Sequence, residues 1–260
     1  MKVAILAGGR GTRLGNRPES PPKPLVEIGG RPILWHVLKQ FRHQGFNDFI
    51  VALGHRGTEI EAYLRRLADS ERGLDLRSAG AGQGDADEPL RGGWRVSLVH
   101  SGQERSNGSR LLRLRPWLDR DGFLMAWSDG LADLDLQALV ACHRAERRLV
   151  TLAAVHPPSR FGMLSLEGSR VTSFEEKPRL DQLWINGAFF AIDPAIFERL
   201  TAEGCSLESH VLPRLAAEGE LTAYRHEGFW DCMDTPADRA RLESLWSEGR
   251  APWAPWRQAA

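Results

Sequence analysis

The residues best suited to chemistry lie in a glycine-rich, basic segment near the start of the chain. After an apolar run it contains the glycines, hydroxyl and cation that suit a phosphate: Leu6, Gly8, Gly9, Gly11, Thr12 and Arg13. Lys23 follows, between two prolines. Glycines let backbone N–H groups approach phosphate oxygens, and cations neutralise their charge. The segment predicts a site for a small anion with several charges.

Two common nucleotide motifs are excluded by the details of this segment. No Gly-Lys-Ser/Thr sequence closes it, as a Walker A loop requires, and Leu14 stands where the dinucleotide fingerprint needs its third glycine. Pro18, Pro21 and Pro22 cannot lie in a helix interior. We therefore expect an extended basic loop around the phosphates. An ordinary glycine-rich turn after a first strand is the alternative.

Two aspartates could hold a metal ion. Asp129 follows the apolar run Phe123–Ala126, and Asp234 precedes Thr235 and Pro236. Ligands of open α/β sheets bind beyond the carboxyl ends of strands, and magnesium prefers a few carboxylates together with phosphate oxygens and water. Each aspartate alone is also compatible with a turn or a helix cap, and Asp234 with a simple helix entry.

A third group of residues could hold a sugar phosphate. Glu176 and Lys177 follow an expected strand and precede a proline. Lysine can pair with a phosphate, and a carboxylate can accept hydrogen bonds from sugar hydroxyls. Asn186 lies in an apolar run, where its amide needs partners, and a polyol is one candidate. A charged turn closed by a proline is the alternative for Glu176 and Lys177.

These segments together resemble a known signature. Gly8-Gly9-x-Gly11-Thr12-Arg13-Leu14, Pro22-Lys23-Pro24 and Gly30-Arg31-Pro32 are similar to the motifs of the sugar-1-phosphate nucleotidylyltransferases. The continuation Leu25–His36 resembles the glucose-1-phosphate cytidylyltransferase branch. Gly249-x-Ala251-Pro252-Trp253 extends the likeness to nearly the whole chain.

The resemblance implies an activity and a set of roles. The activity is transfer of a cytidylyl group from CTP to a sugar 1-phosphate, glucose 1-phosphate foremost, with Mg²⁺, giving a CDP-sugar and pyrophosphate. The implied catalytic residues are Arg13, Lys23, Asp129 and Asp234, of which Asp129 and Asp234 bind the metal. Nucleotide contacts fall to Leu6, Gly8, Gly9, Gly11, Thr12, Arg13, Lys23, Asn107, Arg110 and Asp129. Sugar-phosphate contacts fall to Gly162, Glu176, Lys177, Asn186 and Gly187.

Several positions depart from the family pattern. They surround the expected base and sugar rather than Lys23 or the aspartates: Asn107, Ser109, Trp127, Ser128 and Ala188. The base and the acceptor therefore stay open, with GTP or dTTP and a heptose, hexosamine or polyol phosphate as alternatives. A catalytically silent nucleotide sensor is the alternative of another class. Asp133 and Asp231 match no family position, and we expect them to be solvated or capping residues.

Alternating strand and helix patterns must position these residues. They predict an α/β fold of the nucleotide-diphospho-sugar transferase type, a Rossmann-like mixed, mostly parallel sheet flanked by helices. We expect one domain over 1–260, with a nucleotide half at about 1–155 and a sugar-phosphate half with the tail at about 156–260. The glycine-rich residues 72–93 predict a surface excursion, and 163–175 a hairpin.

Composition limits the other classes of function. Acidic and basic residues number 34 each, which gives no electrostatic case for nucleic acid or an anionic membrane. Three scattered cysteines fit a reducing compartment. The chain shows neither a signal peptide nor an apolar run long enough to cross a membrane, so we expect a cytoplasmic protein. Trp246, Trp253 and Trp256 could cover a contact in a homo-oligomer, or pack within the chain.

Overall fold

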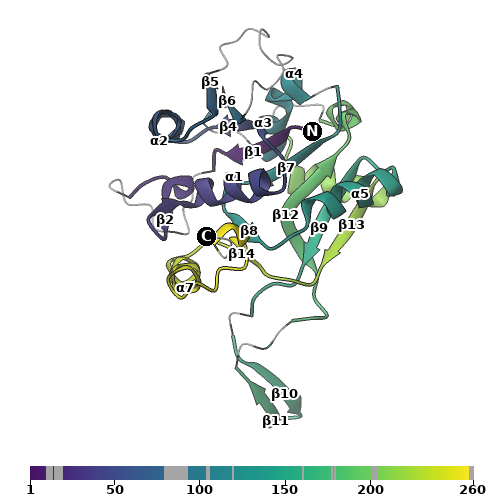
Figure 1. The fold of residues 1–260 in the computed structure, drawn as a ribbon. Helices are drawn as coiled ribbons and strands as arrows, with labels where there is room; N and C mark the ends of the chain where they lie inside the picture. Colours follow the sequence, from purple (N-terminus) through teal and green to yellow (C-terminus); the bar gives the residue numbers. More distant parts are fainter. Residues whose placement is uncertain are drawn as a thin grey trace.

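An eight-stranded sheet forms the centre of the computed structural model (Figure 1). The structure describes residues 1–9, 14, 20–78, 93–103, 106–118, 120–159, 161–176, 178, 180–200 and 204–257. In spatial order the strands are β13 (Leu221–His226), β9 (Val150–Val155), β12 (Ile185–Ile192), β7 (Phe123–Trp127), β1 (Val3–Ala7), β4 (Asp48–Leu53), β6 (Trp94–His100) and β5 (Leu74–Ser78). Among these strands β12 runs antiparallel to both neighbours and the other pairs are parallel. The predicted fold class is confirmed.

Helices cover both faces of this sheet. One apolar cluster contains α1 (Ile33–His43), α2 (Gly57–Ser70), α5 (Leu136–Glu146) and α7 (Pro236–Ser247). The other contains α3 (Asn107–Arg113), α4 (Arg115–Leu118), α6 (Leu212–Ala217), the 3₁₀-helix η3 (Pro194–Glu198) and the π-helix η4 (Leu207–Val211). Alternate residues of β1 point into the two clusters, because successive side chains of a strand face opposite ways. The central strands of the sheet are therefore buried on both faces, whereas the edge strands β5 and β13 are partly exposed.

Two short two-stranded ribbons accompany the sheet, and one of them joins segments that are distant in sequence. β8 (Gly130–Ala132) pairs antiparallel with β14 (Trp230–Cys232), so that Gly130 lies opposite Cys232 and Leu131 opposite Asp231. β2 (Glu27–Ile28) pairs with β3 (Arg31–Pro32) directly before α1. The β8–β14 pair joins the segment after β7 to the segment that enters α7.

A hairpin arm extends away from the body of the molecule (Figure 1). It consists of β10 (Met163–Glu167) and β11 (Arg170–Glu175), paired antiparallel as the sequence predicts. Every residue of the two strands is exposed, including Leu166 and Phe174. The arm therefore adds nothing to the two buried clusters.

The structure corrects one of the predicted elements. Residues 74–78 form the edge strand β5, although we expected them in a surface excursion; 79–92 lie outside the described residues. None of the helices in the described part of the chain combines the length and apolar character needed to cross a membrane.

The tryptophan-rich tail packs within the chain. Trp253 is 1% exposed, and its indole nitrogen lies 3.4 Å from Nδ1 of His36 in α1. Trp246 contacts the same imidazole edge-on, and His36 Nε2 bonds to the carbonyl oxygen of Ile28 at 2.9 Å. The 3₁₀-helix η5 (Pro255–Arg257) places Trp256 edge-on against Trp35. The tail thereby fixes α1 and the β2–β3 turn.

Candidate active site

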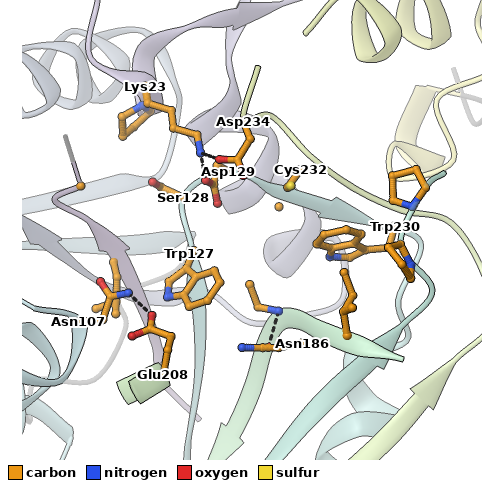
Figure 2. A pocket seen from close by; sticks show the side chains of 18 residues that line it. Lys23, Asn107, Trp127, Ser128, Asp129, Asn186, Glu208, Trp230, Cys232 and Asp234 are labelled. Carbon is orange, nitrogen blue, oxygen red and sulfur yellow. Dashed lines mark hydrogen bonds and ion pairs between the residues drawn. The ribbon is translucent and has the colours of Figure 1, made fainter. Parts of the chain in front are cut away.

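Three predicted site residues meet in space (Figure 2). Lys23 begins the 3₁₀-helix η2 (Lys23–Leu25), Asp129 follows β7, and Asp234 lies between β14 and α7. Lys23 Nζ lies 2.5 Å from Asp234 Oδ1 and also contacts Asp129 Oδ2. The three side chains are 13%, 19% and 16% exposed, so the cluster is sheltered but reachable.

Backbone contacts hold the two aspartates in register. The amide of Met233 donates to the carbonyl oxygen of Asp129 at 3.1 Å, which continues the β8–β14 ladder by one step. Lys23 is fixed by a tight turn, in which the amide of Leu25 donates to the carbonyl oxygen of Pro22 at 2.7 Å. The prolines on both sides limit the backbone of this turn. The chain therefore brings the three charges together through short, rigid connections.

The charges of the cluster favour a further cation. Burial by itself lowers the pKa of the Lys23 ammonium, but the carboxylates of Asp129 and Asp234 outweigh it and hold that pKa above its usual value. Two carboxylates against one ammonium leave a net negative charge. Lys23 therefore stays protonated, and the site can still bind a divalent ion that brings anionic phosphates with it.

The cluster lies in the wall of a cavity of about 620 Å³ (Figure 2). This volume suits a ligand of nucleotide-sugar size. Predicted residues that line it are Leu6, Gly9, Lys23, Asn107, Asp129, Asn186 and Asp234. Other lining residues, which sequence reasoning did not assign, include Pro157, Pro158, Glu208, Trp230 and Cys232. The cavity thus lies at the carboxyl ends of β1 and β7, where ligands of open α/β sheets bind.

Asn107 is held at the cavity by a residue far away in sequence. Its side-chain amide donates to Glu208 Oε1 at 2.5 Å, and Glu208 also lines the cavity. Gly108 allows this approach, because a side chain there would overlap the carbonyl oxygen of Cys205. No local sequence pattern predicts Glu208 as a site residue, because its partner Asn107 lies on another element.

Arg110 is buried against the segment that follows β6. It is 3% exposed, and its guanidinium donates to the Ser101 hydroxyl at 3.0 Å and to the carbonyl oxygens of Gly102 and Gln103 at 2.9 and 3.0 Å. A side chain at Gly8 would overlap this guanidinium. Arg110 is not among the described residues that line the cavity. The Arg110 guanidinium therefore lies between Gly8 and the segment after β6.

The segment around Asn186 forms a bulge at the cavity. Asn186 Oδ1 accepts from the backbone amide of Ala188 at 2.9 Å, and the β12–β9 register shifts here. Ala188 has a φ of +62°, a conformation that favours glycine. Trp230 Nε1 donates to the carbonyl oxygen of Gly187 at 2.7 Å. The bulge turns Asn186 and Ala188 toward the cavity, whose wall they form.

The remaining predicted residues lie elsewhere. Gly162 and Glu176 stand at the base of the hairpin arm, close to each other and to the Phe174 ring, and they do not belong to the described cavity wall. Gly11, Thr12, Arg13 and Lys177 lie outside the described residues.

Two aspartates that we expected to be solvated or capping have partners. Asp231 is 2% exposed, and both its carboxylate oxygens bind Arg241, at 2.6 and 2.7 Å. Asp133 Oδ1 lies 2.9 Å from His226 Nε2. The expectation is wrong for Asp231, which is buried because its partner Arg241 comes from another element; Asp133 is exposed, as expected. Asp231 is a buried ionic residue beside the site.

Cys232 lines the cavity without being a nucleophile. Burial, followed by the charges of Asp129, Asp234 and Asp231, raises the pKa of its thiol to about 12. A thiol reacts as the thiolate, so Cys232 stays neutral and inert near pH 7.

The donor set fits magnesium. Carboxylate oxygens are the hard ligands that Mg²⁺ prefers, and it completes its shell with phosphate oxygens and water. In the described part of the chain no group of three or more His, Cys, Asp or Glu side chains gathers to hold a metal. Asp129 and Asp234 would therefore hold the ion together with a phosphorylated ligand.

Comparison with known proteins agrees with this geometry. Residues 2–238 match the family described as nucleotidyl transferase. A glucose-1-phosphate cytidylyltransferase of Salmonella typhi is 40% identical over 257 residues, which cover 98% of this chain and 100% of the relative. The chain belongs to the nucleotidyl transferase family. A probable glucose-1-phosphate cytidylyltransferase of Bacillus subtilis is 34% identical, with coverage of 98% and 100%.

Solved structures support the fold of this nucleotidyl transferase. HddC from Yersinia pseudotuberculosis superposes with a TM-score of 0.69 at 21% identity, covering 94% of this chain and 99% of that chain. At this identity the likeness supports the architecture alone.

Proposed function

We propose that this nucleotidyl transferase moves a cytidylyl group from CTP to glucose 1-phosphate with Mg²⁺, producing CDP-glucose and pyrophosphate. The observation that carries the proposal is the meeting of Lys23 with Asp129 and Asp234 in the wall of a cavity of nucleotide-sugar size. The relatives named as cytidylyltransferases, at 40% and 34% identity over nearly the whole chain, support the choice of CTP and glucose 1-phosphate.

The reaction needs little from the protein beyond positioning and charge. A phosphate oxygen of glucose 1-phosphate attacks the α-phosphorus of CTP, and the bond from that phosphorus to the bridging oxygen of the β-phosphate breaks. The acceptor oxygen is already anionic, so no general base is required. In-line placement and neutralisation of phosphate charge are the main contributions of such sites.

Each side chain of the cluster has a part in this scheme. Lys23 binds the α-phosphate and neutralises the charge that grows during attack. Asp129 and Asp234 hold Mg²⁺, which when bound acts as a Lewis acid toward the phosphate oxygens. Arg13 pairs with the departing pyrophosphate. Gly8, Gly9, Gly11 and Thr12 contact the nucleotide through backbone groups.

The acceptor is assigned to the other end of the cavity. Asn186 and Gly187 contact the sugar phosphate at the β12 bulge, and Gly162, Glu176 and Lys177 are assigned to the same ligand. The described cavity contains Asn186 but neither Gly162 nor Glu176. The assignment of these two residues rests on the family resemblance.

A pyrophosphate-release screen tests the proposal. Purified protein is mixed with Mg²⁺, each of CTP, UTP, GTP and dTTP, and a panel of sugar 1-phosphates. We expect CTP with glucose 1-phosphate to have the highest kcat/KM. A higher kcat/KM with GTP or dTTP, or with a heptose, hexosamine or polyol phosphate, would show that the substrate assignment is wrong. Nucleotide binding without pyrophosphate release from any combination of nucleotide and sugar 1-phosphate would identify a catalytically silent nucleotide sensor.

A further inference from the structure

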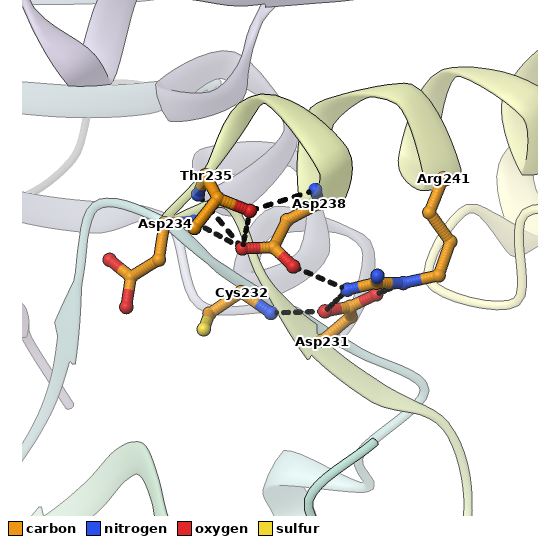
Figure 3. Close-up of polar contacts among 6 residues, drawn as sticks. All are labelled: Asp231, Cys232, Asp234, Thr235, Asp238 and Arg241. Atoms are coloured by element: carbon orange, nitrogen blue, oxygen red, sulfur yellow. Dashed lines mark hydrogen bonds and ion pairs between the residues drawn. The ribbon is translucent and has the colours of Figure 1, made fainter. Parts of the chain in front are cut away.

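A chain of ionic contacts runs behind the site aspartate Asp234 (Figure 3). Asp238 Oδ2 accepts from the backbone amide of Asp234 at 3.2 Å and from the amide and hydroxyl of Thr235, both at 2.8 Å. One carboxylate oxygen of the first turn of α7 thereby binds the backbone of the site residue.

The other oxygen of Asp238 connects this contact to β14. Asp238 Oδ1 accepts from Arg241 at 2.9 Å, and the same guanidinium holds both oxygens of Asp231, at 2.6 and 2.7 Å. Asp231 Oδ1 also accepts from the amide of Cys232 at 2.8 Å. The backbone amides of Cys232 and Asp234 are therefore both linked to the Arg241 guanidinium, the first through Asp231 and the second through Asp238.

Helix capping accounts for only part of this arrangement. Thr235 and Asp238 form a complete capping box, which by itself starts α7. Asp231 lies outside the helix, and Asp231 and Asp238 are each 2% exposed. Burying charged groups is costly, and apolar residues of similar size often stabilise a fold as well or better. Asp231 and Arg241 are therefore not needed merely to begin the helix.

Asp231, Asp238 and Arg241, here called the α7 ionic cluster, lie where they can set the geometry of Asp129 and Asp234. Asp231 is opposite Leu131 in the β14–β8 pair, and the amide of Met233 bonds to the carbonyl oxygen of Asp129. Figure 3 shows the Asp234 carboxylate directed away from the cluster, while its backbone is held by it. A change at Arg241 is thus passed to Asp234 through the backbone, without contact with the ligand.

We propose that Asp231, Asp238 and Arg241 are positioning residues that fix Asp234 relative to Asp129, so that both carboxylates can hold one divalent cation. This inference rests on the proposed function, because it assigns the two aspartates to the metal. Removal of partners that orient metal-binding carboxylates typically weakens metal affinity by about 10- to 100-fold.

The test compares Arg241→Met, Asp231→Asn and Arg241→Lys with a matched control, Arg250→Met, whose guanidinium pairs with Glu248 at the surface. Mn²⁺ binding is measured by electron paramagnetic resonance, with and without CTP, alongside the Mg²⁺ dependence of kcat and thermal melting. Asp231→Asn keeps the shape of the side chain, so it tests the positioning role if Arg241→Met does not yield folded protein.

We expect Arg241→Met and Asp231→Asn to weaken Mn²⁺ binding, and to raise the Mg²⁺ concentration for half-maximal activity, by about 10-fold or more. The KM for glucose 1-phosphate should stay within about twofold, because that ligand does not depend on Asp234. Arg241→Lys should restore part of the affinity, since an ammonium cannot bind both carboxylate oxygens as a guanidinium does. Arg250→Met should match the wild type.

A lower melting temperature with unchanged Mn²⁺ affinity would show that the cluster is only structural. A wild-type protein that binds no Mn²⁺ would also overturn the inference. If the wild type binds Mn²⁺ but turns over no CTP, the proposed reaction fails, and the Mn²⁺ titrations of the variants still decide the role of the cluster.

Discussion

Nζ of Lys23 lies 2.5 Å from Oδ1 of Asp234, and the same ammonium contacts Asp129. The Lys23 ammonium thus forms ion pairs with both carboxylates that we assign to magnesium. A metal ion must displace this ammonium or share the carboxylates with it. A nucleotide supplies the phosphate to which Lys23 can move, so metal binding and nucleotide binding should assist each other.

Lys23→Met is the first test of this relationship. Without nucleotide the variant should bind Mn²⁺ about 10-fold more tightly than the wild type, because the competing ammonium is gone. Its turnover should nevertheless fall by about 10²-fold or more, since the α-phosphate loses its cation. Mn²⁺ titration and pyrophosphate release measure the two effects, with Lys39→Met as control, because Lys39 of α1 lies over the Trp35 ring and does not line the cavity. Unchanged or weaker Mn²⁺ binding would contradict the competition.

Asp129→Asn combined with Asp234→Asn should abolish activity at any Mg²⁺ concentration. The expected loss is at least about 10³-fold, because neither amide replaces a carboxylate as a magnesium ligand. The side-chain shapes are kept, so the protein should still melt cooperatively, as judged by circular dichroism. Asp121→Asn, at an exposed position, is the control. Substantial activity in the double variant would place the metal elsewhere.

His36 predicts a pH dependence of stability. It is fully buried, and burial lowers its pKa to about 4 from an unfolded value near 6.5. Between these values the unfolded chain binds the extra proton, so stability from this residue is complete above pH 6.5 and is lost as pH falls toward 4. The loss should reach about 2–3 kcal/mol between pH 7 and pH 4.5. Urea unfolding at both pH values measures it.

His36→Gln separates this effect from other titrations. The variant should be less stable at pH 7, because it loses contacts with Ile28 and Trp253. It should also lose less stability than the wild type on going to pH 4.5. An equal pH dependence in the two proteins would show that other groups are responsible.

Gly29 and Gly30 form a matched pair for testing the packing of the tail. Both have positive φ, +59° and +71°, but a side chain at Gly29 would overlap the Trp246 indole, whereas nothing lies within 4 Å of one at Gly30. Gly30→Ala should cost about 1 kcal/mol through the backbone alone, and Gly29→Ala about 3 kcal/mol or more. Chemical denaturation compares them. Equal losses would mean that Trp246 does not pack where the structure places it.

The site was predictable where a motif coincided with a strand end. Lys23 follows the glycine-rich segment after β1, Asp129 follows β7, and the carboxyl ends of these adjacent parallel strands lie at one edge of the sheet. Asp234 required the family resemblance, because its local sequence also predicts a helix entry. The predicted helix entry is confirmed, since Thr235 caps α7.

What the sequence did not predict depends on pairings between distant segments. β8 and β14 have three residues each, too few for a periodic pattern, yet they bring Asp129 and Asp234 together. Asp231 is buried through its pairing with Arg241 on another element, and Glu208 meets Asn107 across 101 positions. Such contacts follow from tertiary packing, which no local sequence pattern predicts.

Oxygen labelling gives the most direct test of the central claim, attack of the acceptor phosphate on the nucleotide. Glucose 1-phosphate labelled with ¹⁸O in all non-bridging phosphate oxygens is incubated with CTP, Mg²⁺ and the protein, and the products are followed by ³¹P nuclear magnetic resonance and mass spectrometry. We predict CDP-glucose with ¹⁸O in the bridge between its two phosphorus atoms, together with unlabelled pyrophosphate. Labelled pyrophosphate, or no CDP-glucose at all, would contradict the assigned reaction.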